Sequence, residues 1–209
     1  MFEGITIENC MAMMNCLGCT QKNYMKDQIL SPSEAYTRQI GIVIRGCIHI
    51  IQEDIWGRNA FISYTDDKDI FGIPLLREKM ADRGIIFKAS EPTTVLFLPV
   101  DKILYPCKNS CPFHLQLSRN LFNMISRRNI TLMEKIEITS KSSLREKVLA
   151  YLSLDAQKAG SATITLPLNR TEMADYLCTN RSALSRELAK MKQEGIIDYN
   201  QRVFHLQNI

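Results

Sequence analysis

Polar side chains suited to binding nucleic acid recur near the C-terminus, in the segment NRTEMADYLCTNRSALSRELAKMKQEG. Its second half carries a set of them at helical spacing: Arg181, Ser182, Ser185 and Arg186. An arginine guanidinium can donate two hydrogen bonds to guanine, and a serine hydroxyl can contact a base edge or a phosphate. Residues 180–192 hold four basic side chains and one acidic side chain, a net charge of +3. We therefore expect this stretch to bind DNA.

Two short helices must position these side chains. Asn169 with Glu172 three residues later predicts a capping box at the start of the first helix. The tight connection CTN follows, Asn180 can cap the second helix, and Gly195 can end it. This pattern is typical of a helix-turn-helix, whose second helix places its N-terminal residues in the major groove. By spacing alone, a solvated amphipathic helix pair fits equally well.

The last residues, GIIDYNQRVFHL, predict two short strands around Asn200 and Gln201, a wing whose Arg202 could touch phosphate. We therefore expect a set of DNA-binding residues drawn from both helices and the wing. These are Arg170, Thr171, Asn180, Arg181, Ser182, Ser185, Arg186, Lys190 and Arg202.

Residues 20–100 are rich in short β-like runs separated by turns, of which IGIVIRGCIHIIQED is the longest. Gly46 marks a bulge or bend inside it. Many short strands at regular spacing favour an antiparallel sandwich or small barrel. The 209 residues are 45% apolar, enough for one large or two small domains, and the net charge of +4 permits an anionic partner.

Residues 113–138 form a long amphipathic helical pattern, which would rise ~37 Å as a domain spine or half of a coiled coil. The predicted dimerisation stripe is Leu117, Leu121, Ile125, Leu132 and Ile136. Ser143 with Glu146 predicts a new helix that stops at Gly160. We expect three parts in an α+β fold: an antiparallel β domain over 1–111, a dimerisation helix over 112–139, and a winged helix-turn-helix over 140–209.

The C-terminal segment resembles the DNA-binding domain of the Crp/Fnr family of bacterial transcription regulators. The family pattern R-x-x-[ILM]-A-x-x-L-x-x-x-R-x-x-[VIL]-S-R-x-L is matched by Arg170, Met173, Ala174, Leu177, Arg181, Leu184, Ser185, Arg186 and Leu188. More weakly, the order of elements over nearly the whole chain is similar too. The segments QEDIWG and CKNSCPFH are most like clostridial-type members.

This resemblance implies a β-roll of the cyclic-nucleotide-binding type (a double-stranded β-helix) that senses an effector, and a homodimer formed through the long helix. It also implies binding to a palindromic operator in double-stranded DNA, whose half-sites lie ~34 Å apart, and RNA polymerase as a further partner. The effector would reposition the paired recognition helices. An adaptor that had lost DNA binding would show acidic or bulky residues where Arg181 and Arg186 stand.

Family members that bind cyclic nucleotides carry Phe-Gly-Glu and a downstream Arg-[Ser/Thr]-Ala. The candidate effector-binding residues here are Phe71, Gly72 and Arg83. Ile73 stands in place of the glutamate, and an apolar side chain cannot accept the hydrogen bond of a ribose hydroxyl. We therefore predict no cofactor, and cyclic AMP is disfavoured.

The seven cysteines leave open a redox or metal sensor, with an iron–sulfur cluster or zinc held by candidates among Cys16, Cys19, Cys107 and Cys111. Their spacing departs from that of the iron–sulfur members of the family. A thiol oxidoreductase using Cys16 and Cys19 is a third reading, but the motif lacks a βαβ context and no acid–base constellation accompanies it, so we do not expect an enzyme. Without a signal-like segment or membrane span, we expect a cytoplasmic protein with no membrane partner.

Overall fold

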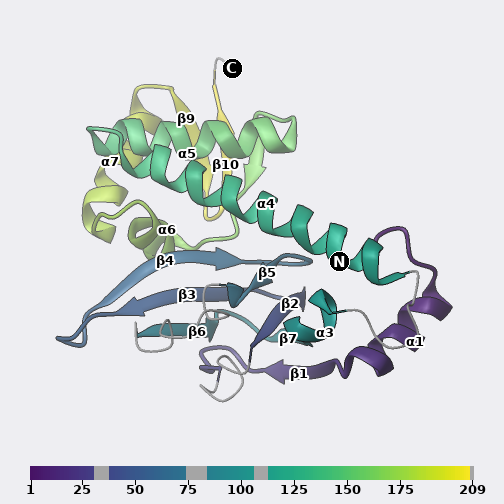
Figure 1. Ribbon diagram of the computed structural model, residues 1–209. Helices are drawn as coiled ribbons and strands as arrows, with labels where there is room; N and C mark the ends of the chain where they lie inside the picture. Colours follow the sequence, from purple (N-terminus) through teal and green to yellow (C-terminus); the bar gives the residue numbers. More distant parts are fainter. Residues whose placement is uncertain (31–37, 74–83, 106–112, 208–209) are drawn as a thin grey trace. The chain divides into compact units, whose positions relative to one another are not determined.

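The structure of the protein, a computed structural model, describes residues 1–30, 38–73, 84–105 and 113–207. The chain divides into two compact units, Met1–Ile130 and Thr131–Ile209. No described helix combines the length and apolarity needed to cross a membrane. The predicted α+β class is confirmed, with an antiparallel β domain, a long helix and a C-terminal helix-turn-helix (Figure 1).

The first unit contains two antiparallel sheets. One has the order β1-β7-β2-β5, from β1 (Thr20–Tyr24), β7 (Thr93–Pro99), β2 (Gln39–Arg45) and β5 (Ile70–Phe71). The other has the order β4-β3-β6, from β4 (Asn59–Thr65), β3 (Ile48–Glu53) and β6 (Ile85–Ala89). Helix α1 (Ile7–Leu17) precedes the sheets, and α3 (Val100–Leu104) follows them.

Strands β2 and β7 alternate between two hydrophobic cores, because successive side chains of a strand point to opposite faces. Val43 and Phe97 belong to the core that also contains residues of β3, β5 and β6. Their neighbours Ile42 and Leu96 belong to the core formed with the helices. The four-stranded sheet is therefore covered on both faces, which explains the near-continuous apolar runs in its sequence.

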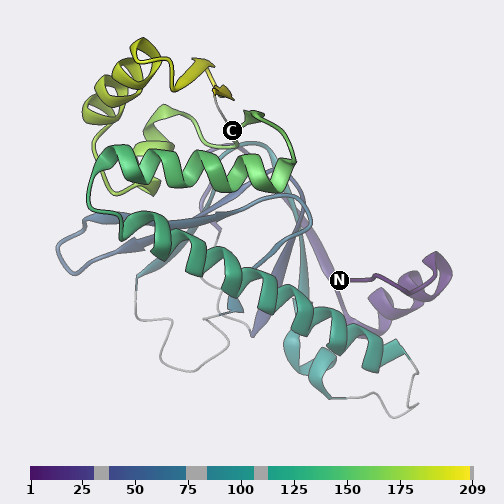
Figure 2. The ribbon, with the colours of Figure 1, turned by 90° about the horizontal axis from the view of Figure 1, so that it is seen from above.

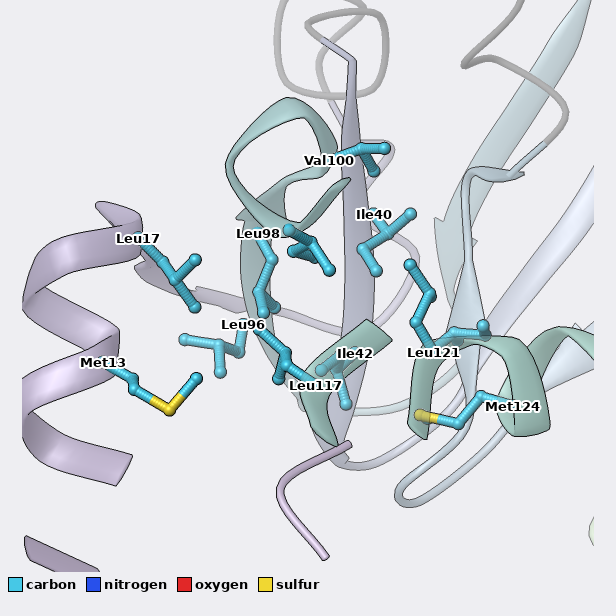
Figure 3. Packing of buried hydrophobic residues seen from close by; sticks show 12 residues of the cluster. Met13, Leu17, Ile40, Ile42, Leu96, Leu98, Val100, Leu117, Leu121 and Met124 are labelled. Carbon is cyan, nitrogen blue, oxygen red and sulfur yellow. The ribbon is translucent and has the colours of Figure 1, made fainter. Parts of the chain in front are cut away.

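Helices α1, α3 and α4 supply one side of the second core. Figure 3 shows Met13 and Leu17 of α1, Leu117 and Leu121 of α4, and residues of β2 and β7 converging in this cluster. Leu117 is fully buried and Leu121 is 5% exposed.

Gly46 lies between β2 and β3 with φ +98°, after a register shift between Val43 and Arg45. A Cβ atom at this position would lie 2.5 Å from the hydroxyl of Thr93 and 2.7 Å from the carbonyl oxygen of Pro92. The predicted bend is confirmed, and the backbone conformation and close approach both require glycine.

Helix α4 (Phe113–Thr139) is 27 residues long and unbroken (Figure 2). Its predicted dimerisation stripe needs correction, because Leu117 and Leu121 are buried in the core of their own unit and Ile125 packs partly against it. The large apolar side chains that stay exposed on α4 are Leu115, Phe122, Ile130, Leu132, Met133 and Ile136. The helix thus has a second apolar face, which includes Leu132 and Ile136 of the predicted set.

The second unit contains α5 (Leu144–Ala159), α6 (Arg170–Tyr176), α7 (Arg181–Gln193) and a three-stranded antiparallel sheet. The sheet has the order β8-β10-β9, from β8 (Thr163–Thr165), β10 (Val203–Leu206) and β9 (Ile197–Asn200). The predicted capping box of Ser143 and Glu146 is present, and Gly160 ends α5 with φ +60°.

The division between the units falls inside α4, after Ile130, and not near residue 112 or 140. The last residues of α4 contact the second unit's own elements. Glu134 pairs with Lys158 of α5 at 2.6 Å, and the ammonium of Lys135 lies 4.6 Å from the ring centroid of Tyr176. The end of the long helix is thereby part of the C-terminal unit.

Candidate nucleic-acid interface

Helix α7 is fixed at its start by Asn180, whose side-chain oxygen accepts a hydrogen bond from the backbone N–H of Ala183 at 2.8 Å. Its apolar face is anchored by Leu184, Leu188 and Met191, each fully buried. A capped helix with three buried anchors cannot rotate about its axis, so the direction of its other face is set by packing.

The predicted base-contacting residues lie on the exposed face of α7. Arg181, Ser182, Ser185, Arg186 and Lys190 are all exposed. Within the part of the chain that the structure describes, neither Arg181 nor Arg186 has a hydrogen bond or ion pair. Two guanidinium groups are therefore presented to solvent from a rigid helix with their donors unused.

The single acidic side chain of α7, Glu187, forms an ion pair within the domain. Arg145 of α5 donates a hydrogen bond to Glu187 at 2.7 Å and bonds to both carboxylate oxygens of Glu194, at 2.6 and 3.1 Å. These hydrogen bonds raise the pKa of Arg145 and lower that of Glu194. The pairing ties α5 to α7 and offsets part of the negative charge of the two carboxylates, which would otherwise oppose a phosphate backbone.

The connection between α6 and α7 is the tight turn that the sequence predicts. Cys178 adopts a left-handed conformation with φ +54°, and the backbone N–H of Thr179 donates to the carbonyl oxygen of Ala174 at 2.9 Å. The side chain of Cys178 is exposed. The two helices are thus joined by a short, hydrogen-bonded turn, as a helix-turn-helix requires.

Helix α6 begins at the capping box of Asn169 and Glu172. The Asn169 side chain accepts from the backbone N–H groups of Thr171 and Glu172, and the Glu172 carboxylate accepts from the Asn169 N–H at 2.6 Å. The Thr171 side chain is exposed at this helix start. Predicted Thr171 and Asn180 therefore both lie at helix N-termini, where the exposed Thr171 hydroxyl can contact a phosphate.

Arg170 differs from the other predicted arginines because the domain itself uses it. Its guanidinium lies 4.8 Å from the ring centroid of Tyr199 and 5.2 Å from that of Phe204, and it donates to the carbonyl oxygen of Gln201 at 3.2 Å. Burial lowers its pKa. Arg170 ties α6 to the wing, and this engagement leaves fewer of its donors for DNA.

The predicted wing is the hairpin β9–β10, with Gln201 in its turn at φ +52°. Arg202 is exposed and donates one hydrogen bond to the carbonyl oxygen of Pro167 at 3.0 Å. At the wing's base, Lys192 pairs with Asp198 at 2.5 Å. Arg202 retains further donors beyond this bond, since a guanidinium carries five.

The sequence analysis missed Ala189, which is exposed on α7 one turn after Ser185. A small apolar side chain at such a position can contact the methyl group of thymine. The i+4 spacing from Ser185 was the available signal.

Two of the three predicted effector residues, Phe71 and Gly72, lie in the described part of the chain. Phe71 is 3% exposed and packs with Phe87 and Phe97, at centroid distances of 5.0 and 6.2 Å. Gly41 makes room for this ring, because a Cβ atom there would approach the Phe71 ring to within van der Waals overlap. Gly72 has φ +88°, and Arg83 lies outside the described residues. Phe71 is therefore part of the aromatic core.

The cysteine candidates are only partly described, since Cys107 and Cys111 lie outside the described residues. Cys16 is exposed in the last turn of α1, whereas burial raises the pKa of Cys19 to about 11. A thiol with that pKa is protonated at neutral pH and is a poor nucleophile, although a bound metal ion would lower its pKa. Among the described residues, no three His, Cys, Asp or Glu side chains are grouped to hold a metal ion.

A buried arginine in the first unit was also missed as a key residue. Arg128 of α4 is 8% exposed and donates to the hydroxyl of Ser63 at 2.6 Å and to the carbonyl oxygen of Tyr64 at 2.7 Å. It also pairs with Asp69 at 3.3 Å. This clasp fixes the rotation of α4 against β4 and the turn before β5.

Comparison with known proteins agrees with this geometry. The sequence model of the Crp-like helix-turn-helix domain matches residues 146–209. The transcriptional activator protein FnrL of Cereibacter sphaeroides is 32% identical over 69 residues, a match that covers 29% of this chain and 28% of FnrL. The matched segment thus spans little more than a quarter of that relative.

The fold extends the similarity to most of the chain. A CooA variant from Carboxydothermus hydrogenoformans superposes with a TM-score of 0.71 and 19% identity, covering 99% of this chain and 88% of CooA. FixK2 from Bradyrhizobium japonicum gives a TM-score of 0.68 at 19% identity, covering 91% and 93%. Residues 146–209 thus match the Crp-like helix-turn-helix domain, and the chain shares the fold of these solved structures.

Proposed function

We propose that the protein is a sequence-specific DNA-binding regulator of transcription. The observation that carries this proposal is the exposed face of α7, where Arg181 and Arg186 have no partner within the described chain while every buried position of the helix is apolar. Leaving two guanidinium groups unpaired on a rigid helix has no structural benefit. It is the arrangement that a bidentate contact with guanine requires.

Each part of the domain has a separate task in this proposal. The first turns of α7 enter the major groove, where Arg181, Ser182, Ser185 and Arg186 meet base edges. The exposed N-terminus of α6 at Thr171 and the wing residue Arg202 hold the phosphate backbone on either side. Backbone contacts position the domain, and base contacts give specificity.

A homodimer formed through the second apolar face of α4 is part of the proposal. Leu115, Phe122, Met133 and Ile136 are each more than 60% exposed. An exposed row of large apolar side chains along one helix is unfavourable in water and is typical of an association surface. A two-fold axis would present two copies of α7 to a palindromic operator.

We further propose that an effector acting on the β domain changes DNA affinity through α4, since this one helix runs from the first unit into the second. Such an effector must bind one arrangement more tightly than the other to shift the equilibrium. The filled aromatic core around Phe71 and the isoleucine at position 73 argue against cyclic AMP as that effector. RNA polymerase is the expected protein partner of a regulator bound at a promoter.

A metal or thiol sensor is the alternative to a small-molecule effector. The raised pKa of Cys19 makes this thiol a poor nucleophile for thiol-based sensing, and Cys107 and Cys111 lie outside the described residues. We therefore rank it second.

The test begins with selection of bound fragments from genomic DNA and measurement of the dissociation constant for the best site. Arg186→Ala should weaken binding to that site by about 1–3 kcal/mol and relax the preference at one base position. Arg45→Ala, which removes an equally exposed arginine at the end of β2, is the matched control and should bind like the unaltered protein.

Two results would contradict the proposal. The first is a selection that enriches no sequence over bulk genomic DNA. The second is an Arg186→Ala variant that binds the selected site and its base-substituted derivatives as the unaltered protein does.

A further inference from the structure

A single polar residue interrupts the exposed apolar row of α4. Leu115, Phe122, Asn129 and Ile136 recur at intervals of seven residues, and all four side chains are exposed. Residues seven apart lie almost in line along a helix, because seven residues make nearly two turns. Asn129 therefore stands in the middle of the surface through which the proposed homodimer would form.

Packing in the β domain sets the direction of Asn129. Its neighbour Arg128 is held by Ser63, Tyr64 and Asp69, so α4 cannot rotate about its axis without breaking the clasp. The next residue of a helix points about 100° away. Asn129 is thus turned outward by the same contacts that turn Arg128 inward.

We propose that Asn129 pairs with Asn129 of a second copy and thereby fixes the two-chain state and the register of the two α4 helices. This inference rests on the homodimer of the proposed function. An amide offers both a hydrogen-bond donor and an acceptor, so two identical amides can satisfy each other. They meet only in an alignment that sets position 129 opposite its own counterpart.

An alignment shifted along the helix leaves the amide buried against an apolar neighbour. A shift by seven residues would set Asn129 against Phe122 or Ile136 of the other copy, where its donors and acceptor are desolvated without a partner. A polar residue at one seam position of a coiled coil specifies alignment and chain number in this way, at some loss of stability. The alternative is that Asn129 is a solvated surface side chain with no role in dimerisation.

Charge substitutions at position 129 distinguish these readings. Asn129→Lys and Asn129→Asp each place like charges face to face in an in-register dimer, and each variant alone should dimerise at least tenfold more weakly in sedimentation equilibrium. An equimolar mixture should restore dimers, and native mass spectrometry should show that they contain one chain of each variant. Circular dichroism confirms that each variant is folded.

Asn123 provides the matched control, because it is an exposed asparagine on the same helix but outside the seven-residue row. Asn123→Lys and Asn123→Asp should each dimerise like the unaltered protein.

The possible failures are distinguishable. An unaltered protein that stays monomeric at all concentrations would overturn the homodimer itself. If the unaltered protein is a dimer and both Asn129 variants keep its affinity, the inference fails while the homodimer stands. Weakened variants that do not recover on mixing would also overturn it, since position 129 would then not face its own counterpart.

Discussion

Arg128 in the β domain and Arg186 on α7 illustrate two opposite uses of the same side chain. Arg128 is 8% exposed and donates hydrogen bonds to Ser63, Tyr64 and Asp69. Arg186 is exposed and has no partner within the described residues. Both lie on amphipathic helices next to apolar residues, and the sequence pattern would predict an exposed side chain at both positions.

The difference shows how to separate structural charges from functional ones in this fold. A buried arginine with three acceptors stabilises its own unit, and removing it leaves those acceptors unsatisfied. An exposed arginine without acceptors contributes little to folding and is available to an external anion. Arg170 and Arg145 lie between these extremes, since both hold the C-terminal unit together while partly reaching solvent.

The largest effect is expected for Arg128→Ala. The substitution leaves the Ser63 hydroxyl and the Asp69 carboxylate without their cation, which should lower the free energy of unfolding of the first unit by about 3 kcal/mol. Urea unfolding followed by circular dichroism measures it. Arg127→Ala, an exposed neighbour, is the control; an equal loss there would show that the clasp is not the cause.

Arg181→Ala should give the reverse result. DNA affinity for the selected site should fall by about 1–3 kcal/mol, while the free energy of unfolding should change by less than about 0.5 kcal/mol, as is usual for exposed positions. Fluorescence anisotropy and urea unfolding of the same preparation measure the two quantities. A variant that loses stability and keeps its DNA affinity would show that Arg181, like Arg128, has a structural role.

The capping residues test whether the interface depends on local order. Asn169→Ala removes the acceptor for two backbone N–H groups of α6 and should lower the free energy of unfolding of the C-terminal unit by about 1 kcal/mol. Thr171→Ala, two residues later, leaves the cap intact and serves as the control in the same urea titration. Equal losses in the two variants would count against the capping box as the source of the stability.

The smallest effect concerns Lys135, whose pKa burial lowers to about 8 although the Tyr176 ring attracts the ammonium. Below pH 8 the side chain is charged in both states, so the cost of burying the charge is fully present. As pH rises above 8, the folded state releases its proton first, and the free energy of unfolding should increase.

Lys135→Met should therefore be more stable than the unaltered protein at pH 7, and the difference should shrink by pH 9.5. Urea titrations at both pH values follow the change. A difference that stays constant with pH would mean that the Lys135 pKa is not lowered.

The local signals in the sequence were reliable where the chemistry is local. The capping boxes at Ser143 and Asn169, the cap at Asn180, the glycine stops and the bend at Gly46 are all found in the structure. The caps and helix stops depend on residues within a few positions of one another, and Gly46 was marked by its own residue type. For the same reason the exposed face of α7 could be predicted, since three buried apolar residues at helical spacing define the opposite side.

The long helix shows where such reasoning fails. Helix α4 has two apolar faces. The hydrophobic periodicity of the sequence includes the residues of both faces, and it does not indicate which face packs against the helix's own domain. Leu117 and Leu121 were assigned to a dimer interface, but they complete the core with Met13 and Leu96. The predicted division of the chain at residues 112 and 140 differs for a related reason, because the contacts of α4 change partners after Ile130 and not at either end of the helix.

The sequence by itself therefore determined the elements, their caps and the polar face of the recognition helix, since these follow from hydrogen bonds and periodicity within a few residues. Only the tertiary structure decided which side of α4 is buried, which arginines stabilise the fold, and which aromatic ring packs in the core of the β domain. Those choices depend on contacts between residues distant in the chain, such as Arg128 with Ser63 or Arg170 with Tyr199. Burial and pairing across such distances convert identical side chains into structural or functional ones.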